Sequence, residues 1–315
     1  SAVVQNGGTS TLRMNTLARP AFGGTVNIAA AGIADTDTSN DATGIIGSYA
    51  VVGGADWAVS AAAAADTPIT AYSGYVAMAA SGSDTNNSLL TGSGVLTGSL
   101  TTYSLKVTTT AAGQSLDIGA GNTLTLSSGG VLLTGADAYA INNGSLQGAA
   151  SADLVVHNNL GGKLTIGSTV IDNTATTALT ISGGTTVLTA SNLYTGPTYV
   201  NNGTIEISAN AQLGASTTVP GDPPVTTFAP LYLNGGKLVA TGNLALDDGG
   251  APAVNRNIVL GAGTGGTIDT GANTVTINGV ISGSGVNGSN VGGALVKEGS
   301  GTLILGGANT YNGGT

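Results

Sequence analysis

The sequence predicts an all-β protein built as a parallel β-helix with a loop-rich N-terminal part. The first observation is composition: the 315 residues include 53 glycines, 41% are hydrophobic and only 7% are charged. Disordered chains are poor in apolar residues and rich in charge, so this chain is expected to fold. Little charge together with abundant Thr, Ser, Val, Ile and Gly is typical of many short strands joined by glycine turns.

The second observation is a series of short alternating segments from about residue 86 onward. In each segment apolar side chains occupy every second position, and Gly or Asn-Gly follows, which indicates half-buried strands closed by turns. Strands of four or five residues at irregular spacing favour rungs of a β-helix over the hairpins of a sandwich. The segments begin at Ser115, Thr123, Lys163, Ala178, Thr204, Lys237, Asn257, Thr274 and Thr302. The pairs expected to point inward include Leu124/Leu126, Leu164/Ile166, Leu179/Ile181 and Leu303/Leu305.

The pattern divides the chain into residues 1–85, a head or set of atypical β-helical coils, and residues 86–315, a continuous β-helix. A Pro-rich stretch, 214–230, holds four of the eight prolines. Proline cannot donate to a strand ladder, so we expect a loop protruding from one coil rather than a linker between two domains. Coils averaging about 22 residues would give roughly fourteen coils over the whole chain.

The third observation is a motif that occurs twice. Its residues are Asn192, Tyr194, Gly196 and Thr198 in the first copy, and Asn309, Tyr311, Gly313 and Thr315 in the second, which follows Leu303 and Leu305. Because the tyrosine recurs at one place in a structural repeat, we expect its ring to cover the adjacent coil. The asparagine is expected to hydrogen-bond the backbone of the turn.

Both copies resemble the passenger-associated repeat of bacterial autotransporters, whose pattern runs roughly G-x-G-T-L-x-L-x-G-x-N-x-Y-x-G-x-T-x-V-x-x-G-T-L. Residues 299–315 and 184–205 fall on this pattern, although Thr186 replaces the first inward leucine. Residues 180–315 match it well, whereas residues 86–180 share only the general strand pattern. The resemblance implies a right-handed parallel β-helix that is secreted and displayed at the bacterial cell surface.

Composition also excludes several partners. The net charge of −9 comes from 16 acidic and 7 basic residues, too few bases to neutralise a nucleic-acid backbone. The sequence has no run of eighteen apolar residues, so no transmembrane segment is expected. It also has no cysteine, which favours an extracellular protein that needs no disulfides.

The residues with possible chemistry do not form a recognisable catalytic set. The single histidine, His157, is expected in a solvent-facing turn, since no nucleophile motif accompanies it. Asp35, Asp37 and Asp41 could gather around calcium, but a solvated loop tip is favoured because the spacing of known calcium loops is missing. We therefore expect no catalytic residue, no cofactor and no metal.

Paired carboxylates are what a polysaccharide-cleaving β-helix would need. Asp247, Asp248 and Glu298 are the conspicuous acids outside loops, and adjacent strand residues such as Asp247 and Asp248 face opposite sides. A polysaccharide-cleaving enzyme is accordingly the third hypothesis.

The first hypothesis is a non-enzymatic extracellular structural protein, a rod that forms part of a surface fibre or filament. The coil at Thr315 ends in unpaired backbone, so the expected partner is a second copy or further repeats of the same chain, stacked end to end. The alternative is an adhesin that binds a surface glycan or a cell through the head, around Trp57, Tyr72 and Tyr75.

Overall fold

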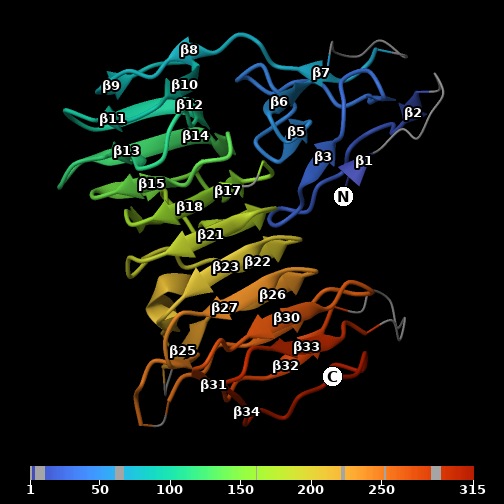
Figure 1. The fold of residues 1–315 in the computed structure, drawn as a ribbon, viewed down its shortest axis with the longest axis vertical. Helices are drawn as coiled ribbons and strands as arrows, with labels where there is room; N and C mark the ends of the chain where they lie inside the picture. Colours follow the sequence, from blue (N-terminus) through green and yellow to red (C-terminus); the bar gives the residue numbers. More distant parts are fainter. Residues whose placement is uncertain are drawn as a thin grey trace.

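A computed structural model describes residues 2–3, 11–60, 67–160, 162–220, 224–251, 253–284 and 292–315. It confirms the all-β prediction and shows long parallel sheets stacked in register, as in a parallel β-helix. Successive coils lie on one another along the long axis, from cyan at the top to red at the bottom, while the blue N-terminal segment lies beside the upper coils (Figure 1).

Two long sheets form the sides of the helix, and every strand pair along their order is parallel. The first, called the flank sheet, runs through β8 (Val76–Ala77), β10 (Asn87–Thr91), β12 (Leu100–Thr108), β14 (Thr123–Thr134), β17 (Asp153–His157), β20 (Ala178–Ser182), β22 (Thr198–Asn201), β26 (Leu231–Asn234), β29 (Ile258–Leu260) and β32 (Ile281–Gly283). The second runs through β11 (Gly94–Val95), β13 (Gln114–Asp117), β15 (Tyr139–Asn142), β18 (Lys163–Ile166), β21 (Thr185–Leu188), β23 (Thr204–Ile207), β27 (Lys237–Ala240), β30 (Gly266–Asp269) and β33 (Leu295–Glu298).

Shorter strands complete the coils. Near the C-terminal end, a third sheet contains β28 (Leu244–Ala245), β31 (Thr274–Ile277) and β34 (Thr302–Leu305). Near the other end, β9 (Gly82–Ser83) pairs with β12, and β16 (Ser145–Gln147) pairs with β14 and β19 (Thr169–Val170). All nine alternating segments of the sequence therefore form strands in the structure.

The core is a column of aliphatic side chains inside the coils. One ladder, fully buried along its length, joins Leu105, Val131, Val156, Ile181, Val200, Leu233 and Leu260 in register. Each such side chain contributes about 1.5–3 kcal/mol by leaving water. The predicted inward pairs are buried, and Leu303 and Leu305 in the last coil are half-buried against the same core.

The prediction of roughly fourteen coils was wrong, since the described part of the chain places nine strands in the second sheet. Coil length varies, because Thr185 pairs with Thr204 across a short coil, whereas Thr204 pairs with Lys237 across a coil that includes the Pro-rich stretch. The count is low because later coils carry such excursions and because most of the chain before Val76 folds beside the coils.

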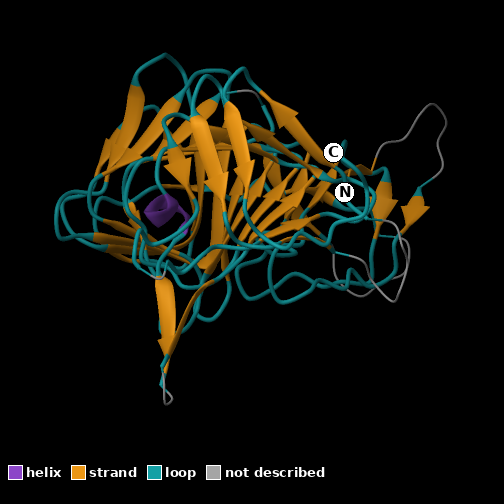
Figure 2. Cartoon of the chain, turned by 90° about the horizontal axis from the view of Figure 1, so that it is seen from below, coloured by secondary structure: helices purple, strands orange, loops and turns teal. Residues whose placement is uncertain are grey.

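The largest excursion is the Pro-rich stretch, called the arm (residues 214–230). Within it β24 (Ser216–Val219) and β25 (Val225–Phe228) form an antiparallel hairpin, directly after a 3-10 turn, η1 (Asn210–Leu213). The arm was predicted as a protruding loop; the structure builds a hairpin that projects away from the body of the coils (Figure 2).

The part of the chain that precedes Val76 forms a small separate unit, called the head. Its main sheet contains β1 (Ala2–Val3), β3 (Val26–Ile28), β5 (Ala50–Val52), β6 (Asp56–Val59) and β7 (Thr70–Ala71), with β2 (Leu12–Arg13) and β4 (Ala34–Asp35) paired beside it. It has its own buried cluster, which includes Ile28, Ile46 and Ile69. At Val76 the chain enters the coils.

Candidate binding surface where the head meets the coils

The flank sheet is buried on both of its faces where the head lies against it. Every residue of β17 and of β20 is buried, although successive side chains of a strand point to opposite faces. One set of side chains, such as Val156, fills the interior of the helix. The other set, such as Val155, must therefore be covered by the head.

Trp57, in β6, lies at the centre of this contact. Its side chain is fully buried with Ile45, Val51 and Leu132, the last of which belongs to β14. A Cβ atom added at Gly130 would lie 2.7 Å from Trp57 Cη2, so the glycine makes room for the indole. Trp57 was predicted as a possible ligand contact; that prediction was wrong, because the indole packs into the seam between head and coils.

The other two aromatic residues of the predicted contact lie beside Trp57 and remain half-buried. Their rings meet edge to face, with centroids 5.0 Å apart between Tyr72 and Tyr75. The Trp57 backbone N–H donates to the Tyr75 hydroxyl (3.2 Å), and burial raises the pKa of Tyr75 well above its usual value. The structure thus brings the three residues together but leaves only the two tyrosines accessible.

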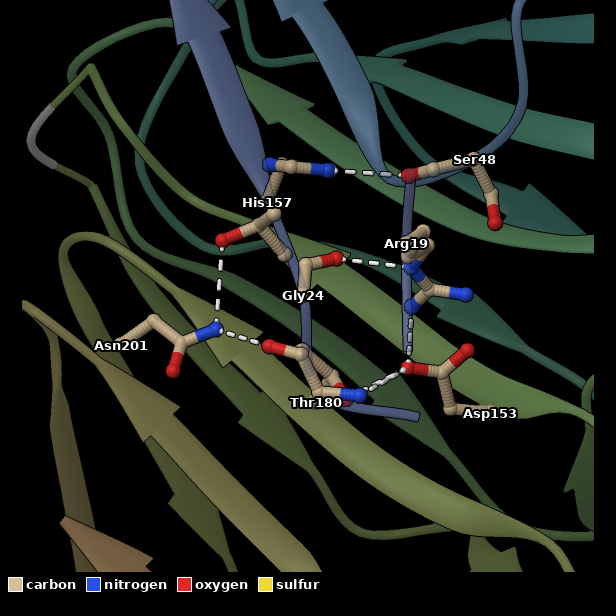
Figure 3. Close-up of polar contacts among 9 residues, drawn as sticks. Arg19, Gly24, Ser48, Asp153, His157, Thr180 and Asn201 are labelled. Carbon is tan, nitrogen blue, oxygen red and sulfur yellow. Dashed lines mark hydrogen bonds and ion pairs between the residues drawn. The ribbon is translucent and has the colours of Figure 1, made fainter. Parts of the chain in front are cut away.

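Asp153, the first residue of β17, is the polar centre of the seam (Figure 3). Its Oδ2 atom accepts hydrogen bonds from Arg19 Nη2 (2.5 Å), Gly23 N (3.1 Å) and Thr180 Oγ1 (2.6 Å). Arg19 also donates through Nε to the Gly24 carbonyl (2.8 Å). A buried carboxylate is tolerated only when it is paired in this way, so these bonds hold the head in one position.

His157, the last residue of β17, is fully buried under the head and does not face solvent as predicted. Its Nε2 atom donates to the Ser48 carbonyl (2.9 Å), while Nδ1 has no partner among the described residues. Burial lowers the pKa of His157 to about 4, so the ring is neutral at pH 7. Ser48 presents its carbonyl rather than its hydroxyl, which is not the arrangement of a base and a nucleophile.

Two small polar clefts open along the lower edge of the head. One, of about 150 Å³, includes Asn27 and Asn159, and the other, of about 250 Å³, includes Asn234. Asn201 lines both, and its Nδ2 atom donates to the Gly23 carbonyl (2.6 Å). Ligand pockets usually exceed about 300 Å³, so these clefts are gaps at the edge of the contact between head and coils and are too small to be typical ligand pockets.

The repeated motif holds coils together at a turn. Asn192 Oδ1 accepts from Val170 N (2.8 Å) in the preceding coil, and its Nδ2 donates to the Gln212 carbonyl (2.6 Å) in the next. Tyr194 is fully buried, and its hydroxyl bonds Thr198 Oγ1 at 2.6 Å.

The second copy of the motif repeats two of these three contacts. Asn309 Oδ1 accepts from Ile281 N at 2.8 Å, and the Tyr311 hydroxyl bonds Thr315 Oγ1 at 2.7 Å. The glycine of the motif is needed in both copies because the backbone of the neighbouring coil leaves no room for a side chain. An added Cβ at Gly196 or Gly313 would lie about 2.5 Å or less from that backbone.

The same two stretches match a family model. The Passenger-associated-transport-repeat covers residues 181–207 and 295–315. The chain has the repeats of an autotransporter passenger domain. Such domains are surface-exposed or secreted, as expected from the sequence.

A curated relative of this passenger domain is the Adhesin BmaC autotransporter of Brucella suis biovar 1 (strain 1330). The two sequences are 32% identical over 182 residues, which is 56% of this chain and 4% of the relative. The chain therefore spans a small fraction of the length of the relative. No solved structure matches the chain.

The three acidic residues considered for calcium each have a partner within the head. Arg13 contacts both Asp35 (2.8 Å) and Asp37 (2.5 Å), and Asp41 Oδ1 accepts from Thr43. Among the described residues, no three His, Cys, Asp or Glu side chains are grouped so as to hold a metal ion.

The carboxylates considered for polysaccharide cleavage have separate local roles. Glu298 pairs with Lys237 at 2.5 Å, while Asp247 and Asp248 accept backbone hydrogen bonds from Gly249 and Gly250.

In the described ranges no helix has the length and apolar character needed to cross a membrane.

Sequence reasoning missed Arg19, Asp153 and the seam they form. A signal for the seam was present, because DLVVH (residues 153–157) has no polar alternation in its centre. A strand that is apolar on both faces indicates cover on both sides.

Proposed function

We propose that this passenger domain acts in a bacterial adhesin, as a stiff rod that carries the head in a fixed position and presents it to a cell surface. The observation that carries the proposal is the relationship to an adhesin over more than half of this chain. The paired Asp153 and the buried Trp57 support it, because they fix the head on the flank sheet.

The proposal places the contact surface on the exposed side of the head, near Tyr72 and Tyr75. Half-buried tyrosines on a rigid support lose little conformational freedom when they bind, which favours affinity. We propose no catalytic role, because the acids considered for cleavage are engaged locally with Lys237 and with turn backbone.

Assembly into filaments by end-to-end stacking was the first hypothesis from the sequence. The family model and the relative concern passenger domains and an adhesin, and neither bears on such stacking. Adhesion is therefore the function that the observations support best.

Attachment of coated beads to host cells tests the proposal. Beads carrying the folded chain are expected to bind cells more strongly than beads carrying the heat-unfolded chain. Equal binding by the two preparations would refute an adhesive role. Release of reducing ends from polysaccharides by the purified chain would instead favour the enzyme.

The position of the contact is tested by Tyr72→Ala, which is expected to weaken bead attachment. Tyr103→Ala is the matched control, since Tyr103 is also half-buried but lies in the coils, in β12. If Tyr72→Ala reduces bead attachment more than Tyr103→Ala does, and the stability of both variants is unchanged, the result supports the head as the contact surface. Equal attachment by the two variants would remove the head from the proposal.

A further inference from the structure

The arm is anchored rigidly at its root by one buried arginine. Arg256, in the following coil, is fully buried and donates through Nε to Asn210 Oδ1 (2.7 Å). Its Nη1 and Nη2 atoms donate to the carbonyls of Ala229 (2.6 Å) and Gly214 (2.9 Å), one at each end of the arm. The two ends of the hairpin are thus fixed to the same side chain.

Beside this root the arm and the coils enclose a groove of about 420 Å³, which lies within the usual size range of ligand sites. One wall is β25, through Thr226 and Phe228, and the other consists of residues 253–255, 257 and 278–280. Phe228 is half-buried, and the Arg256 guanidinium lies 4.6 Å from the centre of its ring. The ring is therefore held in place at the base of the arm.

The coil wall of the groove is also held in a fixed conformation. Asp248 Oδ1 accepts from Gly250 N and Val254 N, both at 2.9 Å, which closes the loop that leads into the wall. Asn257 Oδ1 accepts from Val280 N (2.9 Å), which ties the two halves of the wall together. A site whose walls do not move on binding loses less free energy to ordering.

The groove combines one aromatic ring with three amide side chains and has no charged lining. Asn255, Asn257 and Asn278 line it, and none of the lining residues is acidic or basic. Arg256, which contacts the Phe228 ring, is fully buried and does not line the groove. Asn255 Oδ1 is buried and has no hydrogen-bond partner among the described residues, while Asn278 is exposed. Amides both donate and accept, as sugar hydroxyls do, and a ring offers an apolar face to the C–H side of a sugar.

We propose that this groove binds a neutral oligosaccharide, with Phe228 against a sugar ring and Asn278 on its hydroxyls. An acidic glycan would lose hydration of its charge without gaining a cation in the groove. The groove lies on the arm rather than on the head, so it is a second binding site that adds to the proposed adhesin role.

A glycan panel tests the assignment on the full chain. Neutral, sialylated and sulfated oligosaccharides are presented to the wild-type protein, and the strongest binder is then titrated in solution. Phe228→Ala and Asn278→Ala are each expected to weaken the binding of a neutral oligosaccharide about tenfold. Val225→Ala, on the opposite, exposed face of the same strand, is expected to leave it unchanged.

Three outcomes overturn the assignment: no neutral oligosaccharide binds, only acidic ones bind, or both variants bind the neutral oligosaccharide as tightly as the wild type does. Asn278→Ala makes this test independent of folding, because Asn278 is exposed whereas Phe228 packs on Arg256. Failure here is distinguishable from failure of the adhesin proposal. Beads that attach to cells through a chain that binds no oligosaccharide refute the groove alone, and the reverse result refutes the head alone.

Discussion

Asp153 and His157 lie at the two ends of one five-residue strand and meet the head in different ways. Asp153 is charged and satisfied by three donors, whereas His157 is neutral and keeps one ring nitrogen without a partner in the described part of the chain. Since a buried charge needs full pairing, protonation of His157 is the weak point of the seam. The same residues that fix the head therefore make the contact sensitive to acid.

The first prediction concerns this acid sensitivity. The pKa of His157 is about 4 in the folded chain and about 6.5 when unfolded, so the unfolded state binds the proton more readily. The contribution of neutral His157 to the free energy of unfolding is therefore fully present above pH 6.5. It is lost as the pH falls towards 4, and the total loss is about 3 kcal/mol. Denaturant unfolding of the wild type and of His157→Gln should show this loss only in the wild type. Parallel pH profiles would contradict the prediction.

At the scale of elements, a coil is held to its neighbours by side chains that bond backbone across coils. Asn192 does this in the repeated motif and Arg256 does it at the root of the arm. Both are buried, so their loss leaves backbone groups without partners in a dry environment. The motif and the arm root should accordingly be the places where single polar substitutions cost most.

Replacement of Arg256 tests the arm root. Arg256→Ala leaves two buried acceptors and one half-buried acceptor without a donor, and it is expected to lower the free energy of unfolding by about 3 kcal/mol. Arg256→Lys should recover part of this loss, since it keeps the charge but not the forked donors. Limited proteolysis should cut the arm first in Arg256→Ala. An arm as resistant as in the wild type would show that Arg256 does not anchor it.

The two copies of the motif provide an internal comparison. Asn192 is buried and bonds backbone on both sides, whereas Asn309 is half-buried and bonds Ile281 N. Asn192→Ala is therefore expected to destabilise by about 2–4 kcal/mol and Asn309→Ala by about 1 kcal/mol. Thermal or denaturant unfolding measures both. An equal cost at the two sites would mean that the hydrogen bonds of the motif do not set its contribution.

The strands of the coils could be predicted from the sequence, but the packing of the head against these strands could not. Alternation in segments such as TLTLS or KLTIG reports directly on one buried and one exposed face, so all nine segments form strands. The contact between Arg19 and Asp153 joins residues 134 apart, and no local pattern encodes it. His157 was misplaced for the same reason, because the head that buries it lies far away in the sequence. Trp57, Tyr72 and Tyr75 do lie together in the head, as predicted from the sequence, but Trp57 is buried in the contact with the coils and packs there.

At the scale of the whole molecule, the passenger domain is a column of stacked coils with two appendages, the head on the flank sheet and the arm below it (Figures 1 and 2). The coils supply stiffness, because every long-sheet strand in the described chain pairs with parallel neighbours and the core is continuous. Function on this account belongs to the appendages, which is possible only if each is held in a defined place.

The position of the head on the flank sheet can be tested with an engineered disulfide. A Cβ added at Gly54 in the head would lie 2.6 Å from Asn159 Cβ in the coils, about 1 Å short of the usual separation in a disulfide. The sequence has no cysteine, so the pair Gly54→Cys and Asn159→Cys can only react with itself within the chain.

The control pair is Gly32→Cys and Asn159→Cys, since Gly32 also has positive φ but nothing within 4 Å of its added Cβ. Mild oxidation of the folded chain, followed by non-reducing electrophoresis and mass spectrometry, is expected to link Gly54→Cys to Asn159→Cys and to leave the control reduced. A folded chain in which the first pair stays reduced, or in which the control links equally well, would contradict a head fixed on the flank sheet.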